Sequence, residues 1–104
     1  MKYSFHPKAK NEFLDAIDYY ESCSTGLGLE FVNEIYSTIQ RIIQFPTAWS
    51  KFSENTRRCL TKRFPFGIIY QLLEDNDEFI IIAVMQVNRK PNYWRKRVGV
   101  LRRR

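Results

Sequence analysis

The residues best suited to chemistry lie in the segment from Glu78 to Arg97, which begins as the most apolar run of the chain and ends in a basic, aromatic cluster. Its second half contains the candidate functional side chains Arg89, Lys90, Tyr93, Trp94 and Arg95. Arginine, lysine and tyrosine can bind phosphates and stabilise the negative charge of a phosphoryl transition state. Its first half is rich in isoleucine and valine, which indicates the central β-strand of a sheet that would support these residues. We therefore expect polyanion-binding chemistry where this strand ends.

Most familiar catalytic sites cannot be built from this sequence. His6 is the only histidine, no G-x-S-x-G motif occurs, and Gly26-Leu27-Gly28 is too short for a phosphate-binding loop. A metal-independent ribonuclease that uses arginine, lysine and tyrosine remains open, and so does a binder of anionic surfaces without catalysis. A single histidine before Pro7 is typical of a structural helix start.

We expect neither a metal nor a cofactor. The acidic run Glu74–Glu78 is better explained as a hairpin tip than as a calcium loop. Cys23 and Cys59 are far apart in sequence, and a zinc site that combines them with His6 is disfavoured. We expect two reduced thiols, with a disulfide as the alternative.

The charge is unevenly distributed along one domain that we expect to span residues 1–104. The formal net charge is +6. Residues 1–50 carry four cations and six anions, whereas residues 51–104 carry thirteen cations and five anions. Such asymmetry favours a nucleic-acid or acidic-protein partner. No apolar run is long enough to span a membrane, and the residues near the N-terminus do not show a signal-peptide pattern. We therefore expect the protein in the cytoplasm.

The first half of the chain predicts a short strand followed by two helices. Residues 2–5 alternate as in a strand. Pro7 begins a helix that extends to about Glu21, and Ser24 or Thr25 is expected to cap a second helix that ends at Phe45-Pro46. The short link predicts an antiparallel hairpin whose apolar stripes need a sheet to cover.

The second half predicts an antiparallel meander of three strands, at residues 57–64, 68–73 and 79–87. Residues 47–55 are expected to form a loop that Trp49 and Phe52 pin to the edge of the core. The predicted fold class is therefore α+β, in the order β-α-α-β-β-β, with the helical hairpin on one face of a small, mainly antiparallel sheet.

Both faces of the last two strands are apolar, although one helical hairpin can cover only one face. Strict alternation places Phe79, Ile81, Ala83 and Met85 opposite Ile80, Ile82 and Val84. An uncovered apolar face would be a partner-binding surface. The alternative is that residues 92–101 fold back over it. The basic residues 99–104 are expected to form a frayed tail.

Several short motifs, in order and spacing, resemble the RelE/ParE superfamily of bacterial toxins from type II toxin–antitoxin systems. The motifs are Phe5-His6-Pro7-Lys8-Ala9, Ala16-Ile17-Asp18-Tyr19-Tyr20, Gly26-Leu27-Gly28 with Phe31, the segment Ile42 to Pro46, Arg57-Arg58, Arg63-Phe64-Pro65-Phe66 with Ile69-Tyr70, and Ala83-Val84 followed by Arg89-Lys90-Pro91-Asn92-Tyr93-Trp94. The resemblance implies a small plasmid-stabilisation or growth-inhibiting toxin that a cognate antitoxin neutralises in a hetero-oligomer.

The resemblance leaves two targets open. ParE-like members poison DNA gyrase, and RelE-like members cleave mRNA on the ribosome. RelE-like nucleases carry an arginine where this chain has Gly67, and many ParE-like sequences carry a histidine near Gln86. We therefore favour a ParE-like gyrase inhibitor, in which Arg89, Lys90, Tyr93, Trp94 and Arg95 contact the target or the antitoxin.

The alternative is a ribosome-dependent mRNA endonuclease. In that case Arg89 and Tyr93 would be catalytic, with Lys62 and Arg63 supporting them. A third hypothesis is a degenerate member of the superfamily that binds only its antitoxin and the operator complex.

Overall fold

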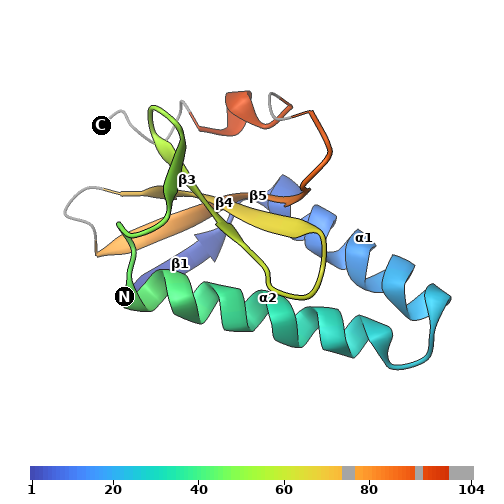
Figure 1. Ribbon diagram of the computed structural model, residues 1–104. Helices are drawn as coiled ribbons and strands as arrows, with labels where there is room; N and C mark the ends of the chain where they lie inside the picture. The colour runs from blue at the N-terminus through green and yellow to red at the C-terminus, as the bar shows by residue number, and fades with distance from the viewer. Residues whose placement is uncertain (74–76, 91–92, 99–104) are drawn as a thin grey trace.

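The computed structural model shows two helices packed on one face of a five-stranded sheet (Figure 1). It describes residues 1–73, 77–90 and 93–98. The elements are β1 (Lys2–Phe5), α1 (Pro7–Cys23), α2 (Leu27–Gln44), β2 (Ser50–Ser53), β3 (Thr56–Leu60), β4 (Phe66–Leu72), β5 (Glu78–Gln86) and the short 3₁₀ helix η2 (Arg95–Arg97). The strand order is β1-β5-β4-β3-β2, and only the pair β1–β5 is parallel. The predicted α+β class is confirmed.

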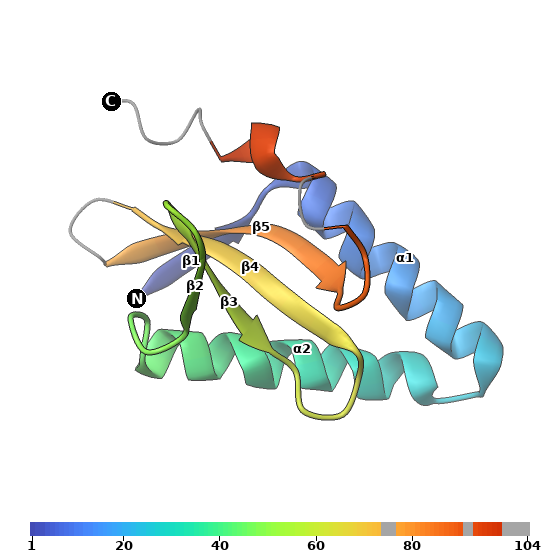
Figure 2. The same cartoon turned by 45° about the horizontal axis from the view of Figure 1, so that its top comes forward.

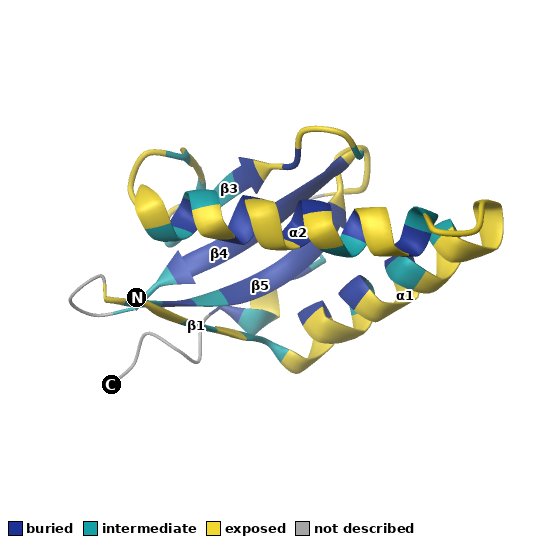
Figure 3. Cartoon of the chain, turned by 90° about the horizontal axis from the view of Figure 1, so that it is seen from below, coloured by how far each residue is buried: buried dark blue, intermediate teal, exposed yellow. Residues whose placement is uncertain are grey.

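Each helix turns one apolar stripe toward the sheet (Figure 3). The stripe of α1 contains Ala9, Phe13 and Ala16, and that of α2 contains Phe31, Ile35, Ile39 and Ile42. The predicted structural role of His6 is confirmed, because its Nδ1 accepts a hydrogen bond from the Lys8 N–H at 3.1 Å and caps α1. No helix in the described ranges is long and apolar enough to cross a membrane.

The cap of α2 differs from the prediction. Gly26, with φ +90°, occupies the N-cap position, so neither Ser24 nor Thr25 caps the helix. The carboxylate of Glu21, at the end of α1, instead accepts hydrogen bonds of 3.0 Å from the N–H groups of Gly26 and Gly28. The N-terminus of α2 favours a negative charge, and a residue from the preceding helix supplies it.

Two predictions about the strands were wrong: one strand was missed, and another was predicted too long. The predicted loop 47–55 contains β2, an edge strand that pairs antiparallel with β3. The predicted strand 57–64 ends at Leu60. The next residue, Thr61, closes a turn, because its backbone N–H donates to the Phe66 carbonyl. The predicted pinning role is confirmed for both aromatic residues: Trp49 packs against the helix-side core, and Phe52 packs on the opposite side of the sheet.

A β-bulge changes which residues of β5 face the helices. Ile69 pairs with Ala83 and Tyr70 pairs with Ile81, so Ile82 has no partner on β4. The bulge reverses the alternation that follows it. The helix-side core therefore contains Phe79, Ile81 and Val84, whereas the other face contains Ile82, Ala83 and Met85. The predicted faces were wrong from Ala83 onward. The predicted central position of β5 was wrong, because β4 is the middle strand and β5 lies between β1 and β4.

The second face of the sheet is covered by the C-terminal segment, drawn in red on the side away from α2 (Figure 2). Trp94 and Val98 are buried there against Ile69, Ile82, Ala83 and Met85. The predicted open partner surface is therefore wrong at this cluster, and the alternative of a folded-back segment is confirmed over residues 93–98. The predicted frayed tail at 99–104 lies outside the described residues, and so do residues 74–76 of the predicted hairpin tip Glu74–Glu78.

Candidate functional site

The candidate site lies where β5 ends and the chain turns back across the sheet. The Arg89 N–H donates to the Gln86 carbonyl at 3.1 Å and closes the turn. The Val87 N–H donates to the Pro65 carbonyl at 3.0 Å, which fixes the exit of β5 against the loop between β3 and β4. Backbone hydrogen bonds therefore hold the start of the basic segment in place.

Arg89 and Tyr93 are in direct contact. The guanidinium carbon of Arg89 lies 3.8 Å from the centre of the Tyr93 ring, and that of Arg97 lies 5.1 Å from the same ring. Both distances are typical of cation–π interactions. Arg89 is exposed and Tyr93 is half-buried. The structure thus brings together the two residues predicted to be most important, with the arginine presented to solvent on an aromatic support.

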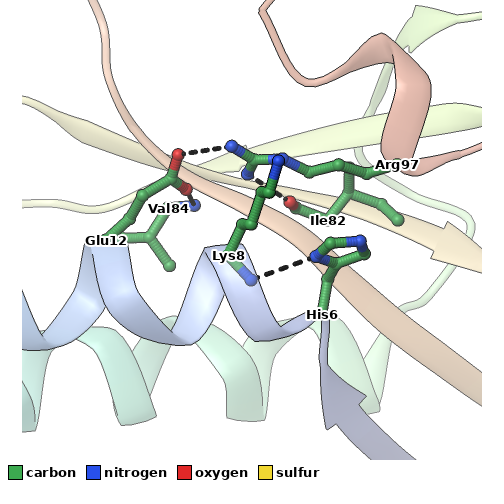
Figure 4. A network of polar contacts seen from close by, with 6 residues as sticks. All are labelled: His6, Lys8, Glu12, Ile82, Val84 and Arg97. Atoms are coloured by element: carbon green, nitrogen blue, oxygen red, sulfur yellow. Dashed lines mark hydrogen bonds and ion pairs between the residues drawn. The ribbon is translucent and has the colours of Figure 1, made fainter.

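Glu12 and Arg97 hold this segment against the sheet (Figure 4). Arg97 Nη2 donates to Glu12 Oε2 at 3.0 Å, and both side chains are largely buried. The other oxygen of Glu12 accepts from the Val84 N–H at 3.0 Å, and Arg97 Nη1 donates to the Ile82 carbonyl at 2.9 Å. Each charged group therefore satisfies its partner and one backbone group of β5.

The early end of β1 explains why these backbone groups need partners. β1 pairs with β5 only as far as Ile81, so the edge of β5 beyond that residue has no neighbouring strand on the β1 side. Buried backbone groups require hydrogen-bond partners. The carbonyl of Ile82 and the N–H of Val84 receive theirs from Arg97 and Glu12.

The Tyr93 hydroxyl keeps its proton and is a hydrogen-bond donor. Burial raises the pKa of Tyr93 above its ordinary value, and the Glu12 carboxylate adds to this rise, whereas Arg89 and Arg97 act in the opposite direction. The pKa remains raised, so the phenol is protonated at neutral pH and does not provide a base in this arrangement. It can donate a hydrogen bond to an acceptor.

A cleft of about 290 Å³ opens between α1 and the end of β5. It is lined by Glu12, Asp15, Ala16, Tyr19, Phe66, Val84, Gln86 and Arg89. Arg89 is thus shared between the cleft and the stack on Tyr93. Sequence reasoning missed the role of Glu12. The available signal was a carboxylate adjacent to the buried stripe of α1, beside Phe13, where a charged side chain needs a partner.

The other predicted contact residues differ in how far they are exposed to solvent. Lys90 and Arg95 are exposed. Trp94 is only 2% exposed and stacks on Phe52, with ring centres 5.7 Å apart. Trp94 therefore acts as a core residue in this conformation, and it anchors the exposed residues beside it.

Lys62 and Arg63 do not join the site. The Lys62 N–H donates to Glu34 Oε2 of α2 at 2.6 Å, and Arg63 forms a 2.7 Å ion pair with Glu30 of the same helix. Phe64, the next residue, packs in the helix-side core, whereas Tyr93 packs on the other face. The two predicted supporting residues thus belong to the α2 side of the molecule.

Gly67 is covered by an arginine from the neighbouring strand. A Cβ atom at Gly67 would lie 3.2 Å from Arg58 Cγ and 3.2 Å from Leu60 Cδ2. Gln86 lies in the cleft beside Arg89.

Among the residues that the structure describes, no group of three or more His, Cys, Asp or Glu side chains could hold a metal ion. Cys23 is exposed and Cys59 is buried, and both are free thiols.

A helical hairpin on a small sheet, with a basic C-terminal segment folded across the other face, defines the structural class of this chain. The sequence profile of the ParE toxin of the type II toxin–antitoxin system parDE matches residues 3–91. The chain therefore belongs to the ParE toxin family, and the resemblance to the RelE/ParE superfamily is confirmed.

One similar solved structure is described as the chromosomal ParDE toxin–antitoxin system from P. aeruginosa. It superposes with a TM-score of 0.69 and 18% sequence identity, over 84% of this chain and 96% of that chain. At this identity the match supports the fold alone. No curated protein sequence matches the chain.

Proposed function

We propose that this ParE-family toxin inhibits DNA gyrase through a protein–protein contact made by the exit of β5. The observation that carries this proposal is the match of residues 3–91 to the ParE toxin family, because the resemblance to ParE-like members implies gyrase as the target. The contact residues would be Arg89, Lys90 and Arg95, with Tyr93 contributing from beneath Arg89.

The geometry of the exit supports a binding role. Arg89 is exposed but rests on the Tyr93 ring, and the segment that follows is anchored by the buried Trp94 and by the Glu12–Arg97 ion pair. A cation held in place before binding loses less conformational entropy when a partner docks. Arginine and tyrosine are also enriched among interface hot spots.

An antitoxin would cover the same surface when the toxin is silent. The similar solved structure is described as a ParDE toxin–antitoxin system, which supports a protein partner encoded with this toxin. From residue 79 onward the chain has eight cations and no acidic residue. An antitoxin segment with acidic side chains would therefore be complementary to the exit of β5.

A ribosome-dependent mRNA endonuclease is the second candidate, and one observation favours it. The structure brings Arg89 and Tyr93, the two expected catalytic residues, into contact. The raised pKa of Tyr93 and the position of Lys62 and Arg63 on the α2 side weigh against it. A protonated tyrosine could donate a proton, but a separate base would be needed.

Two assays on purified toxin separate these functions. In the first, gyrase and relaxed plasmid are incubated with the toxin, and supercoiling and linear cleavage products are followed. In the second, translating ribosomes are incubated with the toxin, and the message is mapped by primer extension. We expect lost supercoiling or trapped cleavage complexes, and an intact message. Cuts at ribosomal A-site codons with unaffected gyrase would overturn the proposal, and inactivity in both assays would support a degenerate toxin.

The site is tested with variants of matched charge. Arg89→Ala should relieve growth arrest and weaken gyrase inhibition at least tenfold, because it removes an oriented interface cation. Lys10→Ala, an exposed cation on α1, is the control and should remain toxic. Equal toxicity of both variants, at equal expression and stability, would show that Arg89 is not part of the contact.

A further inference from the structure

The edge of β5 that faces away from β4 is free beyond Ile81. β1 pairs with this edge only as far as Phe5 and Ile81, and the chain then leaves the sheet, because Pro7 begins α1 (Figure 2). The last hydrogen bond on this side joins the His6 N–H to the Ile81 carbonyl at 2.9 Å. From Ile82 onward, no strand of the described chain lies along the free edge of β5.

The hydrogen bonds to β4 show which backbone groups point toward the free edge. The Val87 N–H donates to the Pro65 carbonyl at 3.0 Å, so Val87 points toward β4. Hydrogen-bonding groups alternate between the two edges of a strand, and the register with β4 is regular beyond the bulge. Val84 and Gln86 therefore point toward the free edge. The bond from the Val84 N–H to Glu12 agrees with this direction.

Two backbone groups on this edge lack partners. The Val84 N–H is bound to Glu12, and the Gln86 carbonyl accepts the Arg89 N–H. Among the described residues, neither the Val84 carbonyl nor the Gln86 N–H has a hydrogen-bond partner. Val84 is only 3% exposed, and a buried carbonyl without a partner is costly. Both residues line the cleft between α1 and the end of β5, so the cleft presents one unpaired acceptor and one unpaired donor.

The unpaired groups match one residue of a parallel strand. In parallel pairing, a residue donates its N–H to one carbonyl of the neighbouring strand and accepts from the N–H two positions further on. The Val84 carbonyl and the Gln86 N–H have this spacing. An antiparallel residue would need both groups of Val84 or both groups of Gln86, and each already has one group bound. A strand added here would therefore run in the direction of β1 and continue it.

The cleft also selects the side chains of such a strand. The two side chains that flank the paired residue would point to the helix side of the sheet, because Val84 packs there. The first would lie beside Val84, and the second would lie toward the end of β5, where Arg89 lines the cleft. Arg89 forms no ion pair within the described ranges, so it favours a carboxylate at the second position. Of the two acidic residues that line the cleft, Glu12 is paired with Arg97, and Asp15 is exposed to solvent, which screens its charge.

We propose that this cleft binds an extended segment of a protein partner as a parallel strand that continues β1. One residue of the segment would bond to the Val84 carbonyl and the Gln86 N–H, and the residue after it would be acidic and contact Arg89. Strand addition of this kind obtains affinity from the main chain and specificity from alternate side chains. The inference rests on the proposed function, because Arg89 belongs to both, and the occupant that fits is the acidic antitoxin segment.

A synthetic peptide tests the pairing on the toxin alone. The probe is Thr-Val-Thr-Glu-Thr with acetyl and amide ends, titrated into nitrogen-15-labelled toxin while the backbone amide signals are followed. We expect saturable shifts at Gln86 and slower hydrogen exchange of its N–H. Shifts at Gln86 that follow the toxin concentration without peptide would identify a second copy of the chain as the occupant and overturn the proposal, as would the absence of saturable shifts.

Methylation of single peptide nitrogens tests the direction of the added strand. A methyl group on the central threonine nitrogen removes the donor to the Val84 carbonyl and should weaken binding about tenfold. A methyl group on the glutamate nitrogen is the control, because that N–H would point away from β5. Equal effects of the two methyl groups would contradict parallel pairing at this edge.

Proline variants test the free N–H on the protein side. Gln86→Pro removes the proposed donor but no bond of the sheet, so it should keep the parent melting temperature and weaken peptide binding about tenfold. Gln86→Ala keeps the N–H and should bind the peptide as the parent protein does. Val87→Pro removes the N–H that bonds to Pro65 and should lower the melting temperature by several degrees. Equal melting temperatures of the two proline variants, or unchanged peptide affinity in folded Gln86→Pro, would overturn the assignment.

The contact with Arg89 is tested by a double-mutant cycle. Glutamine in place of the peptide's glutamate and Arg89→Ala in the toxin should each weaken binding several-fold, and the two changes together should cost little more than either alone. Additive losses would show that the acidic residue does not contact Arg89. The gyrase assay distinguishes this inference from the proposed function. Gyrase inhibition without peptide binding would overturn the inference alone, whereas peptide binding without gyrase inhibition would overturn only the proposed target.

Discussion

Glu12 and Arg97 are separated by 85 positions in sequence and meet in a 3.0 Å ion pair. Glu12 belongs to α1 and Arg97 to the C-terminal segment, and both also bind the backbone of β5. This pair therefore joins three parts of the chain on the free edge of β5. The Glu12–Arg97 ion pair thereby fixes the position of the basic segment that we assign to target contact.

Replacement of Glu12 by glutamine should destabilise the fold by about 2–3 kcal/mol, because a largely buried Arg97 would lose its counter-charge. Chemical denaturation in urea measures this change. Asp15→Asn, at an exposed position one turn further along α1, is the control and should stay within about 0.5 kcal/mol of the parent protein. Equal stability of the two variants would mean that the ion pair does not hold the segment.

Replacement of Trp94 by alanine should cost about 3–5 kcal/mol, since it removes a large aromatic side chain from the cluster with Phe52, Ile82 and Met85. Thermal and urea unfolding measure the loss, and Lys96→Ala, at an exposed position nearby, should leave stability unchanged. If Trp94→Ala keeps full stability but loses gyrase or antitoxin binding, Trp94 is a contact residue rather than a core residue.

Gly28→Ala should destabilise the protein by about 1–3 kcal/mol, although alanine is the better helix former. A Cβ at this position would lie 2.9 Å from Glu21 Oε1 and 3.0 Å from the Ile17 carbonyl oxygen. The new methyl group would displace the carboxylate that caps α2. Ser37→Ala, at an exposed position in α2, should raise stability by a few tenths of a kcal/mol. A stabilising Gly28→Ala would contradict this packing.

Stability should fall as the pH drops below about 6.5, the ordinary pKa of histidine. Burial lowers the pKa of His6 in the folded protein, and the charges of Arg97 and Lys8 lower it further, while Glu12 opposes them. The unfolded chain therefore takes up the proton more readily. The contribution of neutral His6 is fully present above the unfolded pKa and is lost as the pH falls toward the folded pKa.

Melting temperatures between pH 5.5 and 8 test this dependence. In His6→Asn the side-chain oxygen can still cap α1 but has no proton to gain. The variant should therefore lose less stability than the parent protein over this range. The same acid-induced loss in both proteins would assign the pH dependence to other groups.

Short-range patterns were sufficient for the helices and for the class of fold. The stripes of α1 and α2, the helix start at Pro7 and the cap at His6 all depend on residues within a few positions of one another. A helix satisfies its own backbone groups, so its local sequence carries most of the information that defines it. The motif order also sufficed to recognise the superfamily.

The sequence by itself thus determined two helices, a mainly antiparallel sheet, a basic exit behind its most apolar strand, and membership of a toxin family. Tertiary structure alone decided the bulge at Ile82, the cap that Glu21 provides, the burial of Trp94 and the partners of Arg89 and Arg97. The physical reason is that the backbone groups at the free edge of a strand need hydrogen-bond partners, and the apolar second face of a sheet needs a covering segment. Distant parts of the chain supply both. That choice joins residues as far apart as Glu12 and Arg97, and no periodicity in the sequence records it.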